Sequence, residues 1–106
     1  MYTSRVTWET LRSIDSATLS GGYSKIGGPL LFPSYLIKMV NNSSVLVTVS
    51  IDGLTDIDVV PPNSIFVYDE AKTQNSERLP ANTQVFVKGA AGVGLIYLVS
   101  QYLVLN

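Results

Sequence analysis

Asp52, Asp56 and Asp58 are the acidic side chains whose spacing most suggests a chemical site. Carboxylate oxygens bind Ca²⁺, and an EF-hand loop has the pattern D-x-[DN]-x-[DN]-G with a later Glu. The segment DGLTDID does not fit that pattern. Asp52-Gly53 is instead typical of a tight turn, and Asp58, between two apolar residues, is typical of a solvent-facing strand position. We therefore predict no metal site and no cofactor.

The glycine-rich segment Gly89–Gly94 has the composition of a phosphate-binding loop. Dinucleotide-binding loops have the order G-x-G-x-x-G before a helix, and Walker loops require G-K-[ST]. The order here is G-A-A-G-V-G, and an apolar strand pattern follows it. A flexible connection between two strands is the better interpretation.

Most routes to catalysis are closed by composition. The 106 residues include no Cys and no His, so thiolate nucleophiles, Ser-His-Asp triads and imidazole metal ligands are absent. The eight acidic residues show no paired arrangement of the kind that a glycosidase needs. We predict that the protein is not an enzyme.

Charge is sparse and balanced. Charged residues make up 14% of the chain, with a net charge of −1, against about 25% in ordinary domains. The scattered basic residues argue against nucleic-acid binding, and a nearly neutral surface suits contact with other protein. The apolar stretch 93–105 is too short and interrupted to span a membrane. The polar N-terminal segment lacks an apolar export signal, so we expect the chain to be made in the cytoplasm and not exported from it.

Between residues 35 and 69, apolar runs alternate with turn residues. Tyr35–Val40 and Val45–Ile51 are expected to pair across the turn formers Asn41–Ser44. Ile57–Val60 and Ser64–Tyr68 follow as further strands. In the second strand Val45, Val47 and Val49 share one face, which is the pattern of a half-buried strand.

The flanking sequence continues the same pattern. Arg5–Leu11 is predicted as a first strand, with a helix over Trp8–Ser13 as the alternative, and Tyr23–Ile26 as a short strand. Two prolines bracket Pro29–Pro33, whose Leu30, Leu31 and Phe32 are expected to close one end of the core. Gln84–Lys88 and Leu95–Leu103 are expected to form the last pair.

These elements predict an all-β fold: an antiparallel β-sandwich or jelly roll of about eight short strands. We predict a single domain over residues 1–106, with an N-terminal arm over about residues 1–9.

Four segments resemble the motifs of small tailed-bacteriophage virion proteins, and the similarity covers most of the chain after residue 19. The segments are a Gly-Ser-Tyr-like stretch at Gly21–Tyr23, an N-N-[ST] turn at Asn41–Ser43, S-x-D-G-x-T-D at Ser50–Asp56 and P-A-x-T-x-[VI]-[YF]-V-K at Pro80–Lys88. The family's usual Asp-His after the D-G turn is Asp-Ile here, so nothing that depends on that His carries over. The resemblance implies a virion protein, either a capsid decoration (cement) subunit or a head–tail connector component.

The resemblance implies the major capsid protein or neighbouring virion subunits as partners, and a location in the virion. Homo-oligomers are also expected, because exposed strand edges invite pairing and only Lys38 and Lys88 look placed to discourage it. A carbohydrate-binding module, with Trp8 and the six tyrosines as a stacking surface, is a third hypothesis.

Contact residues are expected at the N-terminal arm and in the polar loop 70–80. In the arm the candidates are Tyr2, Arg5 and Trp8, although Trp8 has the alternative of filling the core. In the loop the candidates are Lys72 and Arg78.

Overall fold

The structure is a computed structural model that describes residues 4–34, 36–69 and 80–105. Within them lie a short 3₁₀ turn over Ser16–Thr18 and nine strands. The strands are β1 (Ser4–Trp8), β2 (Arg12–Asp15), β3 (Ser24–Lys25), β4 (Leu36–Ser43), β5 (Val47–Ser50), β6 (Asp58–Val60), β7 (Ser64–Asp69), β8 (Phe86–Lys88) and β9 (Gly94–Leu105). The predicted all-β class is confirmed. The helix alternative for Trp8–Ser13 is wrong, because β1 ends at Trp8, β2 begins at Arg12 and the three residues between them are not helical.

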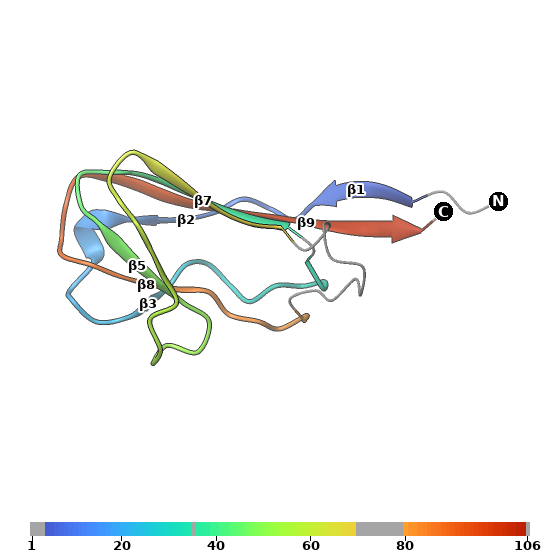
Figure 1. Cartoon of the computed structure of the whole chain (residues 1–106), viewed down its shortest axis with the longest axis horizontal. Coiled ribbons are helices and arrows are strands. Elements are labelled where there is room, and N and C mark those ends of the chain that lie inside the picture. Colours follow the sequence, from blue (N-terminus) through green and yellow to red (C-terminus); the bar gives the residue numbers. More distant parts are fainter. Residues whose placement is uncertain (1–3, 35, 70–79, 106) are drawn as a thin grey trace.

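Two antiparallel sheets pack face to face (Figure 1). The five-stranded sheet has the order β1-β9-β4-β7, with β2 pairing the same long strand β9 as β1 does. The four-stranded sheet has the order β3-β8-β5-β6. Lys38 in β4 and Lys88 in β8 therefore lie in interior strands, and the expectation that they protect sheet edges is wrong.

Two predicted strand pairs are also wrong, because the chain crosses between the sheets where hairpins were expected. β4 pairs with β7 and β9, whereas β5 pairs with β6 and β8. Likewise β8 lies in the four-stranded sheet and β9 in the five-stranded sheet. The physical reason is burial, because Met39 of β4 and Val47 of β5 are both buried in one core. When their strands lie in opposite sheets, the inner face of each sheet is covered by the other.

The two crossings lie side by side at one end of the sandwich. The Ser44 amide donates to the Val93 carbonyl at 2.9 Å, and the Val93 amide donates to Ser44 Oγ at 3.0 Å. These bonds satisfy polar backbone groups at the point where both segments leave their sheets.

Asn41 ties the two sheets together. Instead of opening a turn, it continues β4 and is fully buried. Its Nδ2 donates to the carbonyls of Val45 (2.8 Å), Val60 (2.9 Å) and Pro61 (3.1 Å). The N-N-S segment that resembles the phage motif therefore has a structural role: it holds β4 against the chain that enters and leaves the four-stranded sheet.

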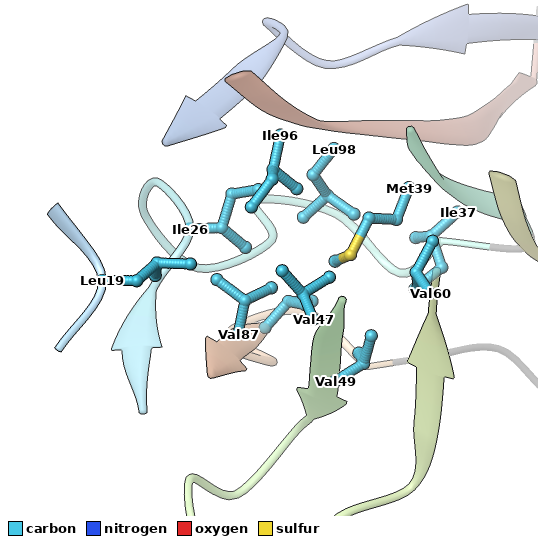
Figure 2. Close-up of a cluster of buried hydrophobic side chains, with 11 residues drawn as sticks. Leu19, Ile26, Ile37, Met39, Val47, Val49, Val60, Val87, Ile96 and Leu98 are labelled. Carbon is cyan, nitrogen blue, oxygen red and sulfur yellow. The ribbon is translucent and has the colours of Figure 1, made fainter. Parts of the chain in front are cut away.

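The core lies between the inner faces of both sheets (Figure 2). It consists of Leu19, Ile26, Ile37, Met39, Val47, Val49, Val60, Val85, Val87, Ile96 and Leu98. The predicted common face of Val45, Val47 and Val49 is confirmed for the last two, and Val45 packs half-buried against the cluster.

The segment between Pro29 and Pro33 closes the core with one side chain rather than three. Leu30 is 1% exposed, as expected, but Leu31 is 69% and Phe32 is 44% exposed. Phe32 instead stacks on Tyr102 of β9, with ring centroids 4.2 Å apart.

The N-terminal arm is not a free extension. From Ser4 to Trp8 it pairs in register with Leu105 to Gln101 of β9. The first residue of β4, Leu36, lies opposite Gln101. Among the described residues, the part of β9 after Gln101 therefore pairs with β1 alone, and β1 and the end of β9 run away from the sandwich as one ribbon (Figure 1). The molecule is accordingly elongated, with extents of 50 × 23 × 22 Å.

Candidate functional site

Of the five contact residues expected from the sequence, the structure describes the side chain of one. Tyr2, Lys72 and Arg78 lie outside the described residues, and for Arg5 only the backbone is described, opposite Val104 of β9. Trp8 ends β1 with 59% of its surface exposed. The alternative in which Trp8 fills the core is therefore wrong.

Trp8 belongs to a larger set of side chains that point outward from the five-stranded sheet. Residues directly opposite in antiparallel strands share a face, so the pairs Trp8↔Gln101 and Leu36↔Gln101 put these three on one side. Their neighbours Ile37 and Ser100 are buried on the other side. We call this side the outer face; its described members are Val6, Trp8, Ser13, Asp15, Leu36, Lys38, Val40, Asn42, Ile65, Val67, Leu95, Tyr97, Val99 and Gln101.

The outer face is apolar and partly open to solvent. In its central rows Tyr97 and Val40 lie next to Ile65, which is 61% exposed. Val67, in the adjacent row, is 51% exposed. The four-stranded sheet lies on the opposite side of the five-stranded sheet (Figure 1). Among the described members of the outer face, Lys38 and Asp15 carry a charge.

The outer face was not predicted from the sequence, although β7 and β9 contain a signal for it. Strand β5 alternates as V-T-V-S, whereas β7 has S-I-F-V-Y-D and β9 contains L-I-Y-L-V. A strand with a solvated face alternates, while a strand covered on both faces is apolar at successive positions. In β7 and β9 apolar residues occur at odd and at even positions, so these strands have apolar side chains on both faces of the sheet. This pattern indicates that both faces are covered when the protein is in its working state.

The edge of this sheet is joined to the segment after β3 by a buried ion pair. Glu9 Oε1 accepts from Arg12 Nη2 at 2.7 Å, and the two side chains are 1% and 10% exposed. Glu9 also accepts from the amides of Leu31 and Phe32, at 3.1 and 3.0 Å. Burial raises the pKa of Glu9, but the hydrogen bonds from Arg12 and the two amides outweigh it, so the pKa lies below its ordinary value.

Arg12 also donates to the segment after β3 and, through Nη1, to Ser100 Oγ of β9 at 3.3 Å. Its Nε donates to the Gly28 carbonyl at 2.9 Å, and Nη2 donates to the Pro29 carbonyl at 2.9 Å. An open groove of about 450 Å³ lies between residues 9–13 and 27–31. The charged groups of this groove bind each other, the backbone and the Ser100 hydroxyl, which is the arrangement of a structural clasp rather than of an acid–base pair.

Three segments that resemble the phage motifs meet at Tyr23, Asp56 and Lys88. Lys88 Nζ lies 3.0 Å from Asp56 Oδ1 and 4.7 Å from the centroid of the Tyr23 ring, and the Tyr23 hydroxyl donates to Asp56. The hydrogen bonds from Tyr23 and Lys88 lower the pKa of Asp56, while the bond to Asp56 raises the pKa of Lys88. The cluster anchors the loop after β5.

The aromatic rings here leave little room for a sugar platform. Lys88 covers one face of Tyr23, and the ring meets Phe86 edge to face, with centroids 6.4 Å apart at 74°. Sugars stack on open ring faces. This geometry does not favour the carbohydrate-binding hypothesis at this cluster.

Searches for related proteins found none: no protein-family model, curated protein or solved structure matches the chain. In the described part of the chain, no helix is long and apolar enough to cross a membrane. The same residues contain no group of three or more acidic side chains placed to hold a metal ion.

Proposed function

We propose that the protein is a non-enzymatic structural subunit of a tailed-phage particle, and that it attaches to the shell through the outer face of its five-stranded sheet. Its partners in this role are the major capsid protein or neighbouring virion subunits. The phage assignment rests on the motif resemblance at Ser50–Asp56 and Pro80–Lys88. The mode of attachment rests on the geometry.

The observation that carries the attachment is the apolar character of the outer face. Three adjacent strands, β9, β4 and β7, lie about 4.8 Å apart over the roughly 23 Å of Leu36–Asn42 and give a largely apolar face of about 330 Å² before the ribbon is added. A patch of that size is comparable with the largest found on ordinary monomers, which are often functional. Such a subunit gains its hold from many identical contacts rather than from one deep site.

A head–tail connector is the second form of this proposal, because the resemblance covers both kinds of virion protein. The two differ in where the protein lies. A decoration subunit occupies every symmetry-related position of the head, whereas a connector forms a closed ring at one vertex. Cryo-electron microscopy of purified particles, with quantitative mass spectrometry against the major capsid protein, distinguishes them. Absence from purified particles contradicts both.

The attachment surface is tested with charge substitutions. Val67→Lys and Ile65→Lys each place a charge on the outer face. When either variant is added to particles that lack the native protein, we expect it to fill fewer of the binding positions than the wild-type chain does. Leu31→Lys is the control, because Leu31 is at least as exposed as Ile65 and Val67 but belongs to the segment on the opposite side of the sheet. Equal occupancy for all three variants would overturn the outer face as the attachment surface.

A further inference from the structure

The loop between β5 and β6, residues 51–57, carries an apolar side chain, Leu54, at its tip. Leu54 is 86% exposed, the highest value among the large hydrophobic residues described. Loop tips are usually polar, because polar side chains form hydrogen bonds with water and an exposed leucine forms none. Figure 1 shows this loop projecting from the four-stranded sheet, away from the outer face.

The turn that carries Leu54 is held in one conformation by its own hydrogen bonds. Asp52 Oδ1 accepts from the amides of Leu54 and Thr55, both at 2.7 Å, and from Ser50 Oγ at 2.8 Å. Ser50 Oγ in turn accepts from the Gly53 amide at 3.0 Å. The bonds from Thr55, Leu54 and Ser50 hold the pKa of Asp52 well below its usual range, so the carboxylate stays ionised.

Contacts outside the turn fix the loop against the sheet. Asp56 is anchored by Tyr23 and Lys88. Gly53 has φ +75°, and a Cβ at that position would lie 3.4 Å from the Phe86 ring, so the backbone of the turn packs on this ring. An apolar side chain on a rigid turn is a preorganised anchor, since little conformational entropy remains to be lost when it is buried.

A small apolar pocket opens at the base of the same loop. Its volume is about 110 Å³. It is lined by Ile37, Val49, Ile51, Ile57, Phe66 and Tyr68. A cavity of about 150 Å³ with Leu, Ile and Phe walls stays dry and binds benzene, so a pocket of this size and lining suits a branched aliphatic side chain.

We propose that Leu54 of one copy inserts into this pocket of a second copy of the chain. The anchor and the pocket match in size and polarity. Ile51 and Ile57 flank the turn and also line the pocket, so both elements lie on the same part of the surface. The contact is therefore able to form twice around a two-fold axis, with each copy giving and receiving one leucine. It uses none of the outer face and does not depend on the virion role.

The charges around the loop predict how the contact responds to salt. Asp52 and Asp58 are both exposed beside the loop, and Asp56 is partly neutralised by Lys88. A two-fold contact brings two such acidic rims together, so their repulsion opposes association at low ionic strength. We expect the dimer to strengthen as added salt screens this repulsion.

Sedimentation equilibrium over micromolar to millimolar protein tests the proposal. The wild-type chain is expected to dimerise reversibly, and Leu54→Ser is expected to weaken the dimer by about a thousandfold, since two buried leucines are lost. Val93→Ser is the matched control, because Val93 is 79% exposed in a different loop, and it should leave the dissociation constant unchanged. Ile51→Arg, which places a charge at the pocket, should act like Leu54→Ser.

A cross-linking experiment tests the partners in the contact directly. The chain has no cysteine, so Leu54→Cys and Ile57→Cys proteins can be mixed and oxidised with no competing thiol. We expect a disulfide between the two variants, and none when Val93→Cys replaces Leu54→Cys.

A wild-type chain that stays monomeric at every concentration overturns the proposal, as does a Leu54→Ser dimer of unchanged strength. Loss of particle binding in Leu54→Ser without any self-association would also overturn it, because the anchor would then serve another protein. Failure of the outer-face variants to affect particle occupancy leaves this contact standing, so the two proposals fail separately.

Discussion

Glu9 and Arg12 are joined at 2.7 Å in a nearly solvent-free ion pair, and the carboxylate of this pair also receives the amides of Leu31 and Phe32. Glu9 and Arg12, which lie at the connection between β1 and β2, therefore hold the segment around Leu31 and Phe32 against the ribbon formed by β1 and the end of β9. Phe32, held in this way, supplies the ring on which Tyr102 stacks.

Removing one partner of this pair should be costly. Arg12→Met leaves a buried carboxylate without its counter-charge, and we expect the free energy of unfolding to fall by about 3–5 kcal/mol. The double variant Glu9→Gln with Arg12→Met should recover part of the loss, because the remaining group is neutral. Urea denaturation measures both, and a single variant as stable as the double one would contradict the role of the pair.

Acid should destabilise the fold through carboxylates of lowered pKa. Glu9 and Asp52 both have folded-state pKa values below their unfolded values of 4.5 and 3.8. Each therefore adds stability above its unfolded pKa and loses it as the pH falls through the folded value. Asp52→Asn retains an acceptor oxygen but does not titrate, so its unfolding free energy should fall less steeply than that of the wild type below about pH 4. Identical slopes in urea titrations would count against this assignment.

Asn41 should contribute far more stability than its neighbour. Asn41→Ala removes the donor that the carbonyls of Val45, Val60 and Pro61 share inside the sandwich, and we expect a loss of about 3 kcal/mol. Asn42→Ala changes an exposed amide next to it in the same strand and should stay within about 0.5 kcal/mol of the wild type. Equal thermal midpoints for the two variants would show that Asn41 does not tie the sheets together.

Gly94 and Gly21 separate backbone strain from collision. Both have positive φ, of +108° and +93°. A Cβ on Gly21 meets nothing within 4 Å, whereas one on Gly94 would overlap the Asn42 carbonyl and lie 2.9 Å from Ser43 Cα. We expect Gly21→Ala to cost about 1 kcal/mol and Gly94→Ala more than about 3 kcal/mol, because β4 would have to move away from β9. Denaturant midpoints for the pair check the difference.

Local features of the fold were predictable from local sequence. Alternation placed Val47 and Val49 on the buried face, because side chains of a strand alternate whatever it pairs with. Asp52-Gly53 predicted its turn, since Gly53 adopts φ +75° where other residues are strained. β2 was not predicted, because R-S-I-D contains a single apolar residue and becomes a strand through its pairing with β9.

The pairing of strands was decided by tertiary structure alone. Asn41–Ser44 and Gly89–Gly94 have the composition of hairpin turns, yet both segments cross between sheets. A short polar connection permits either outcome, and the choice depends on which arrangement buries Met39, Val47 and Leu98 together. The same packing turned Trp8 outward and Glu9 inward, and it brought Tyr23, Asp56 and Lys88 together from three distant segments. Such contacts depend on the positions of whole strands, which no short stretch of sequence encodes.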